Sequence, residues 1–316
     1  MTPANIPLAA WLAAKIKGAG VALDRTGLTP GGSGADNLAF AGRTIEGRHL
    51  IVKVRLREAA RYGTAAWAGK ALTQRGIPAP EVLWHDDSIC VETRCVGAPL
   101  TGAADRLDTS DVMPPAAVVR AATEAGALLR RVHRIRVHGY GRLTPSGTGP
   151  HQSLHESLSL EAAGTRRADP TGGLASAARR VMSGNLWRLA DPGARLLVGD
   201  CAARHIFIDT DSDTISGFID LESARGGHPL ADVAGFSVRE HPQVSRALLD
   251  GYFPAGIDID ELWALTLHRA RIATFLLLFH ACRKEHAITR RFADCLAADL
   301  AAITSETPTA LPAHPQ

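Results

Sequence analysis

Cysteine is scarce in this chain and follows no recognisable spacing. The 316 residues include 5 Cys, an odd number, and no two of them form a C-x-x-C pair. Zinc sites and redox dithiols use such pairs, and disulfide-bonded secreted domains use even sets. The cysteines therefore argue against a zinc site and indicate a reducing cytoplasm.

Runs of one charge and long hydrophobic runs are also missing. The net charge is only +3, with no basic block and no aromatic residues interleaved with basic ones, so nucleic acid is not an expected partner. The longest mainly apolar run, Ile272–Phe279, is far too short to span a bilayer. The first residues carry their charges after the apolar part, unlike a secretory signal. No membrane association is predicted, and the expected location is the cytoplasm.

The chain does have enough apolar material for a large core. Hydrophobic residues make up 46% of the sequence. Its length exceeds the roughly 100–200 residues of one domain, so two lobes are expected. The oligomeric state is not readable from the sequence.

The stretch Leu196–Glu222 carries the densest chemical signal. Its segments IFID and ISGFID are rich in Ile and Phe and flank the polar run Thr210–Asp213, a pattern typical of a hairpin. Asp200 precedes the first strand and Asp220 ends the second, so a tight hairpin brings both carboxylates to one end. Two such acids suit a base and a metal anchor for phosphoryl transfer, although a solvated acidic hairpin has the same pattern.

A glycine-rich segment lies upstream, at Gly31, Gly32, Ser33 and Gly34. Backbone N–H groups of such a loop approach phosphates without hindrance from side chains. A strand is predicted at His49–Val54, on which Lys53 alternates with apolar neighbours. Lys53 is interpreted as a phosphate-binding lysine. A glycine linker and an ordinary edge-strand lysine are the alternatives.

Hydrophobic periodicity places helices over much of the remaining chain. The expected helices are Leu8–Ala19, Arg57–Arg75, Ala117–Arg136, Ala175–Leu189, Pro229–Gly251, Ile259–Arg283 and His286–Ile303. A further strand, Ile89–Glu92, leads into a connector at Glu92–Cys95. The segment Thr144–Gly173, rich in Gly, Pro and Ser, is expected to be a loop or insertion, and residues 305–316 a disordered tail.

The order of these features resembles the aminoglycoside phosphotransferase and choline-kinase-like branch of the protein-kinase-like superfamily. Three further segments support the resemblance: GALLRRVH at Gly126–His133, GYGRL at Gly139–Leu143 and GGHPLADVAGF at Gly226–Phe236. It implies an α+β, two-lobed fold. Residues 1–96 would form a small, β-rich nucleotide-binding lobe, and residues 97–304 a larger, mainly helical lobe for catalysis and substrate.

The resemblance also assigns roles to single residues. Asp200 corresponds to the catalytic Asp that orients the substrate hydroxyl, and Asp220 to the Asp that binds the metal. His205, as a second metal ligand, stands where the family usually has Asn. Asp232 is expected to tie the loop around Asp200. The implied cofactors are Mg²⁺ and, as phosphate donor, ATP or GTP.

For the nucleotide, the resemblance places Lys53 on the α- and β-phosphates and the segment Gly31–Gly34 over them. The backbone of Glu92 and Arg94 would meet the purine.

Three positions depart from the family pattern. Val198 replaces a His that packs and orients the motif. His205 replaces the Asn, and an imidazole can still ligate a metal, although Mg²⁺ prefers oxygen. Ala65 stands where a helix carboxylate normally pairs with the strand lysine, and Glu58 is an alternative partner.

The implied activity is transfer of the γ-phosphoryl group of ATP or GTP to a hydroxyl of a small molecule. From residue 97 onward the chain has 23 Lys and Arg against 24 Asp and Glu, whereas a polycationic aminoglycoside favours a strongly acidic pocket. An antibiotic or related natural product of modest charge is expected, in resistance or biosynthetic self-protection, with aminoglycosides still open. A non-catalytic, nucleotide-binding pseudokinase and a kinase of a sugar or amino-alcohol metabolite are the alternatives.

Overall fold

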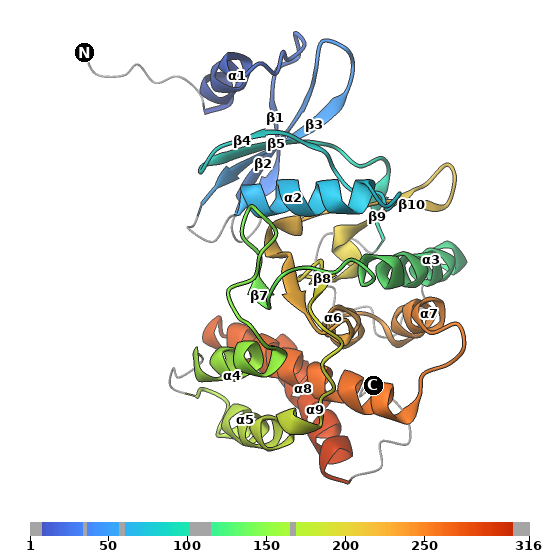
Figure 1. The fold of residues 1–316 in the computed structure, drawn as a ribbon. Coiled ribbons are helices and arrows are strands. Elements are labelled where there is room, and N and C mark those ends of the chain that lie inside the picture. The colour runs from blue at the N-terminus through green and yellow to red at the C-terminus, as the bar shows by residue number, and fades with distance from the viewer. Residues whose placement is uncertain (1–7, 34–36, 57–60, 101–114, 165–168, 306–316) are drawn as a thin grey trace, which may run out of the picture.

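The computed structural model describes residues 8–33, 37–56, 61–100, 115–164 and 169–305. Figure 1 shows an N-terminal part built on a β-sheet and a C-terminal part made mainly of helices. The prediction of an α+β, two-lobed fold is confirmed.

The N-terminal part is a five-stranded antiparallel sheet of order β1-β2-β3-β5-β4. Its strands are β1 (Thr29–Ser33), β2 (Asn37–Arg43), β3 (His49–Arg55), β4 (Val82–His85) and β5 (Ile89–Thr93). Helix α1 (Leu8–Gly18) shares a core with β3 through Leu12, Ile16, Leu50 and Val52. Because strand side chains alternate between faces, Lys53 of β3 points away from this core.

One local prediction in this part is wrong. Gly31, Gly32 and Ser33 end strand β1, in a register that shifts between Pro30 and Gly32, and do not form a loop; Gly34 lies outside the described residues. Helix α2 (Tyr62–Thr73) lies within the helix predicted from Arg57, whose first four residues fall outside the described part of the chain. Gly-Gly-Ser has little strand propensity of its own, so pairing with β2 decided its conformation.

After β5 the chain soon joins a second sheet. Strand β6 (Ala98–Pro99) pairs with β9 (Ile206–Asp209), which also pairs with β10 (Thr214–Phe218). Gly97, just before β6, has a φ of +84°, and a Cβ atom there would lie 1.9 Å from the carbonyl oxygen of Ile208. Only glycine fits this crossing between the sheets.

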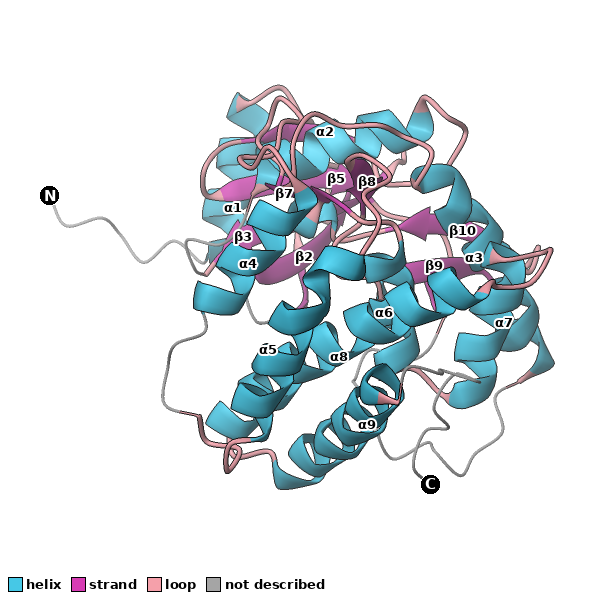
Figure 2. Ribbon diagram, turned by 60° about the horizontal axis from the view of Figure 1, so that its bottom comes forward, coloured by secondary structure: helices cyan, strands magenta, loops and turns pink. Residues whose placement is uncertain are grey.

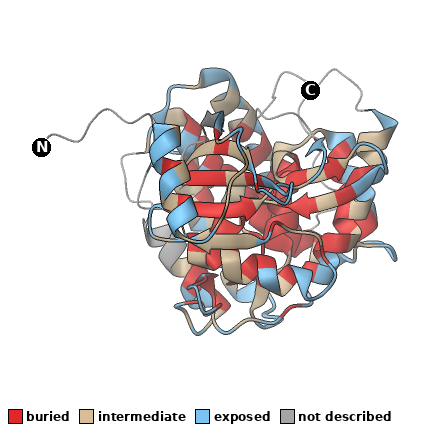
Figure 3. Cartoon of the chain, turned by 90° about the horizontal axis from the view of Figure 1, so that it is seen from above, coloured by how far each residue is buried: buried red, intermediate tan, exposed pale blue. Residues whose placement is uncertain are grey.

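The C-terminal part holds the largest hydrophobic core. Its helices are α3 (Ala116–Val132), α4 (Leu154–Gly164), α5 (Leu174–Asn185), α6 (Leu230–Arg239), α7 (Pro242–Tyr252), α8 (Ile259–Cys282) and α9 (His286–Thr304). Figure 2 shows α5, α8 and α9 side by side. A third sheet has the order β7 (Gly141–Arg142), β11 (Arg225–Gly227), β8 (Arg195–Leu197). In Figure 3 the strands and the inner helices are mostly buried.

Two predictions in this part are also wrong. The predicted loop Thr144–Gly173 contains helix α4. The predicted helix Pro229–Gly251 is two helices, α6 and α7, because Pro242 starts a new helix and disfavours the helical conformation in the residue before it. The predicted disordered tail falls almost entirely in residues 306–316, which lie outside the described part of the chain.

By length and composition alone, α8 is the one helix of the described chain that could cross a membrane. Its apolar window is 72% buried inside the molecule, as in a helix of a protein core. The expectation that Ile272–Phe279 belongs to a buried helix agrees with this placement, although Phe275 and Phe279 themselves are exposed.

Candidate active site

The hairpin of β9 and β10 brings the two predicted aspartates together. Its register pairs Ile206 with Phe218, so Asp200 and Asp220 lie beyond the same end of the strand pair. Asp200, His205 and Asp220 each offer one ligand atom, and these atoms lie within 4.8 Å of one another. The convergence expected from the sequence is present.

A buried network shapes the loop that carries Asp200. The carboxylate of Asp232 accepts hydrogen bonds from the backbone N–H groups of Val198, at 2.7 Å, and Gly199, at 3.0 Å. His133 lies 3.2 Å from the same carboxylate. The prediction that Asp232 ties this loop is confirmed.

Two arginines hold the carboxylate of Asp200. Its Oδ2 accepts a hydrogen bond from Arg204 at 3.1 Å, and its Oδ1 lies 3.1 Å from Nη2 of Arg239. Burial raises the pKa of this carboxyl, but the neighbouring positive charges, of Arg239 first and of Arg204, outweigh burial, so the pKa is lowered. Arg239 was not expected from the sequence, because it occupies the last turn of α6, at a helix end that the sequence did not reveal.

His205 lies between the two aspartates. Its Nδ1 is 2.9 Å from the backbone carbonyl oxygen of Asp200. A carbonyl oxygen can only accept a hydrogen bond, so Nδ1 carries the hydrogen atom and is the donor. Nε2 accepts a hydrogen bond from Nε of Arg204 at 3.2 Å and lies 3.7 Å from Oδ2 of Asp220. The lone pair of the ring is therefore on Nε2, the atom nearest to Asp220.

Lys53 is buried against three carboxylates. Its Nζ lies 2.9 Å from Glu222, 3.1 Å from Glu92 and 3.5 Å from Asp220. Glu92 belongs to the neighbouring strand β5, whereas Glu222 belongs to the short 3₁₀ turn η4 (Leu221–Ser223) of the C-terminal part. Helix α2 has no acidic residue, and Ala65 is buried in it. Glu92 and Glu222 thus take the place of the helix carboxylate that the family resemblance leads one to expect beside Lys53.

The pKa values of Glu222 and Asp220, two of the carboxyl groups around Lys53, are shifted in opposite directions. Burial and the neighbouring charge of Asp220 raise the pKa of Glu222 well above its ordinary value, although Lys53 opposes this. Burial also acts to raise the pKa of Asp220, but a hydrogen bond from Glu222 and the charge of Lys53 outweigh it, so the pKa is lowered. Of the two carboxyls, Glu222 is therefore the weaker acid. Glu58, the alternative partner of Lys53, lies outside the described residues.

Glu92 and Arg94, which were predicted to contact the purine through their backbone, already make contacts within the N-terminal sheet. Glu92 lies in β5 between β3 and β4, and its side chain contacts Lys53. The backbone N–H of Arg94 donates a hydrogen bond to the carbonyl oxygen of His49 at 2.9 Å. A purine contact by the backbone of Arg94 must therefore use its carbonyl oxygen.

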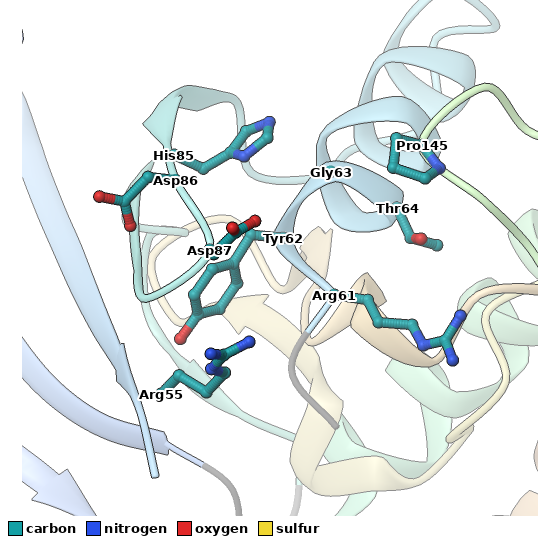
Figure 4. A pocket seen from close by; sticks show the side chains of 9 residues that line it. All are labelled: Arg55, Arg61, Tyr62, Gly63, Thr64, His85, Asp86, Asp87 and Pro145. Atoms are coloured by element: carbon teal, nitrogen blue, oxygen red, sulfur yellow. The ribbon is translucent and has the colours of Figure 1, made fainter. Parts of the chain in front are cut away.

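A separate pocket of about 180 Å³ opens beside the first turn of α2 (Figure 4). Its lining residues are Arg55, Arg61, Tyr62, Gly63, Thr64, His85, Asp86, Asp87 and Pro145. None of the residues predicted for the active site lines it. It is therefore distinct from the place where Asp200, Asp220 and Lys53 converge.

A buried strand lysine that faces an aspartate-bearing hairpin, at the junction of a β-rich and a helical lobe, defines the kinase-like class of phosphotransferases. The family model described as "Phosphotransferase enzyme family" matches residues 27–266, most of the chain. The chain belongs to this family and is a phosphotransferase.

Solved structures share this fold over nearly their whole length. A thermostable mutant of aminoglycoside phosphotransferase APH(4)-Ia, in a ternary complex with ADP and hygromycin B, is 17% identical with a TM-score of 0.69, covering 96% of this chain and 100% of that chain. Macrolide 2′-phosphotransferase MphH from Brachybacterium faecium is 16% identical with a TM-score of 0.58, covering 90% and 97%. The GDP and kanamycin complex of APH(2")-IIia is 14% identical with a TM-score of 0.63, covering 92% and 98%. No curated protein matches the chain.

Proposed function

We propose that this chain transfers the γ-phosphoryl group of ATP or GTP to a hydroxyl group of an antibiotic or a related natural product. The observation that carries the proposal is the convergence of Asp200, Asp220 and Lys53 where the two lobes meet. Membership of the phosphotransferase family supports it, as do fold relatives crystallised with ADP or GDP. The role we assign is resistance or self-protection in the cytoplasm, with the lobes divided near residue 96.

Asp200 is the residue we assign to the substrate hydroxyl. An ionised carboxylate accepts the hydrogen bond of the hydroxyl and aligns its oxygen with the γ-phosphorus. Because Arg204 and Arg239 lower the pKa of Asp200, it is a weak base toward a free alcohol. Its main contribution is orientation, and the proton moves once bonding to phosphorus makes the hydroxyl acidic.

Lys53 supplies fixed positive charge for the phosphates. Glu92 and Glu222 hold its ammonium group in place, so the charge needs little reorganisation when a nucleotide enters. We assign the segment Gly31–Gly34 to cover the phosphates with its backbone, and the backbone of Glu92 and Arg94 to the purine.

His205 and Asp220 form a donor pair that fits a divalent cation. An imidazole lone pair and a carboxylate oxygen lie 3.7 Å apart, and the other ring nitrogen is fixed by a hydrogen bond. By family resemblance the cation is Mg²⁺, which when bound would neutralise charge on the β- and γ-phosphates. His205 and Asp220 would hold it, while Asp200 remains with the hydroxyl.

The acceptor we propose carries little positive charge. Arg204 and Arg239 flank Asp200 and would repel an ammonium group beside the reacting hydroxyl. The fold relatives include proteins crystallised with hygromycin B or kanamycin and macrolide 2′-phosphotransferases. The two arginines favour an acceptor of the macrolide kind or another compound of low charge.

A nucleotide-consumption assay tests this proposal. ATP and GTP are each supplied with a panel of macrolides, nucleosides, peptide antibiotics and aminoglycosides, and mass spectrometry shows whether one phosphate is added. We expect turnover with an acceptor of low charge, and a loss of at least about 10²-fold in Asp200→Asn, which keeps the size of the side chain. Nucleotide binding without phosphorylation of any acceptor would overturn the proposal in favour of a pseudokinase, and turnover of sugars or amino alcohols alone would indicate a metabolic kinase.

A further inference from the structure

The ring of His205 is held in one tautomer by the backbone. Nδ1 donates to the carbonyl oxygen of Asp200 at 2.9 Å, which leaves the lone pair on Nε2. Ligating histidines in metalloproteins are fixed in the same way, by a hydrogen bond from the nitrogen that does not bind the metal. The orientation of His205 is therefore that of a metal ligand.

The distance from Nε2 of His205 to Oδ2 of Asp220 agrees with two ligands of one ion. Ligands about 2.1 Å from a six-coordinate ion lie about 3.0 Å apart when adjacent and about 4.2 Å apart when opposite. The observed 3.7 Å lies between these values. A small adjustment of either side chain brings both atoms onto the same ion.

We propose that the imidazole of His205 makes this site select a first-row transition-metal ion, with Mn²⁺ as the expected ion, over Mg²⁺. Mg²⁺ is a hard ion that binds oxygen ligands, whereas transition-metal ions also accept imidazole nitrogen. Mn²⁺ in addition suits the carboxylate of Asp220 and the oxygens of a nucleotide phosphate. This inference rests on the proposed function, because it concerns the cation of the same site.

Arg204 contacts the same donors as the cation. Its Nε donates to Nε2 of His205 at 3.2 Å, and its Nη2 donates to Oδ2 of Asp200 at 3.1 Å. A metal ion on Nε2 must displace the first of these hydrogen bonds. Arg204 therefore competes with the cation, and its removal should strengthen cation binding.

Electron paramagnetic resonance of Mn²⁺ tests the proposal without turnover. Mn²⁺ is titrated into the full chain with a methylene analogue of ATP or GTP, and Mg²⁺ is then added as competitor. We expect His205→Asn to lower the preference for Mn²⁺ over Mg²⁺ by on the order of tenfold. Arg204→Gln should raise the affinity for Mn²⁺. His155→Asn, on the exposed surface of α4, is the matched control and should change neither.

A spectroscopic signature separates a ligand from a mere neighbour. Electron spin echo measurements should show nitrogen coupling to Mn²⁺ in the parent protein, altered by ¹⁵N-histidine labelling and lost in His205→Asn. Mn²⁺ bound with the nucleotide analogue but without this coupling, or an unchanged ion preference in His205→Asn, would overturn the inference and leave the phosphotransferase proposal intact. If neither analogue brings Mn²⁺ to the protein, the inference also fails, and the nucleotide-consumption assay with Mg²⁺ decides the phosphotransferase proposal separately.

Discussion

Lys53 shows how an absent side chain is compensated from a distant part of the chain. Helix α2 carries Ala65 where the family resemblance leads one to expect a carboxylate, yet the ammonium group has Glu92 and Glu222 within 3.1 Å. Glu222 is two residues from Asp220, so it was visible in the sequence. Its role depends on contact with Lys53, which lies 169 residues earlier in the chain, and no local sequence pattern shows that contact.

Replacing Glu222 tests whether it positions Lys53 by hydrogen bonding or by charge. Oε1 of Glu222 accepts a hydrogen bond from Nζ of Lys53 at 2.9 Å, and the amide oxygen of a glutamine can accept the same hydrogen bond without the charge. We expect Glu222→Ala to lower kcat/KM on the order of 10²-fold through misplacement of Lys53. Glu222→Gln should stay within about tenfold of the parent. Equal losses in both variants, measured under the same conditions, would show that a negative charge is needed.

Arg239 should determine the acid limb of the pH profile. Asp200 must be ionised to orient the hydroxyl, so activity falls as the pH drops through its pKa, which Arg239 lowers. Arg239→Gln removes this charge and raises the pKa of Asp200, so the acid limb of kcat/KM should move to higher pH. Arg239→Lys keeps the charge and should leave the limb near its original position. An acid limb that does not move in Arg239→Gln would contradict the assignment.

At the scale of elements, the break between α6 and α7 builds one wall of the site. Arg239 in the last turn of α6 reaches Asp200, and Glu240, with extended backbone, accepts a hydrogen bond from the N–H of Ala203 at 2.8 Å. In an unbroken helix adjacent residues point about 100° apart. The break ahead of Pro242 therefore lets both side chains reach the segment around Asp200.

Helices α3 and α7 approach each other through glycines. A Cβ atom at Gly126 would lie 2.0 Å from the carbonyl oxygen of Leu248, and one at Gly251 would lie 1.9 Å from that of Thr123. Backbone atoms cannot move aside cheaply, so a single methyl group forces the helices apart.

Alanine at Gly126 should therefore destabilise the fold by about 1–3 kcal/mol. Gly184 in α5 is the control, because a Cβ atom there has nothing within 4 Å. Gly184→Ala should be stabilising by about 0.5–1 kcal/mol, since glycine weakens a helix. Urea unfolding of both variants measures the difference. A loss in Gly184→Ala as large as that in Gly126→Ala would show that the close approach of the helices is not the cause.

At the scale of the whole molecule, the cluster around Lys53 joins the two lobes. Lys53 and Glu92 lie in the N-terminal sheet, whereas Asp220 and Glu222 belong to the C-terminal part. The chain itself crosses between the lobes at Gly97. Ion pairing thus links the residues assigned to the nucleotide with the residues assigned to the cation.

Removing the lysine should weaken the whole fold in a pH-dependent way. Lys53→Met leaves Glu92, Asp220 and Glu222 buried without a cation, at a cost of about 3–5 kcal/mol at neutral pH. The charge of Lys53 is one of the causes that lower the pKa of Asp220, so without the ammonium group the pKa of Asp220 rises in the folded state. The folded state then binds more protons, so the cost should shrink as the pH falls toward 5.

Urea unfolding at pH 7.5 and pH 5 measures this dependence. Lys53→Met combined with Glu92→Gln should recover part of the loss. A cost that is the same at both pH values would contradict a role of buried carboxylates.

The sequence by itself determined the helical and β-rich regions, the hairpin with Asp200 and Asp220 at one end, and the place of Lys53 on a strand. These features follow from periodicity, turn residues and order along the chain, which are local properties. Only the tertiary structure decided that Glu92 and Glu222 hold Lys53 and that Arg239 holds Asp200. The physical reason is that charge pairing, burial and the resulting pKa values depend on residues far apart in the chain, and their positions exist only once the two lobes and their helices have packed together.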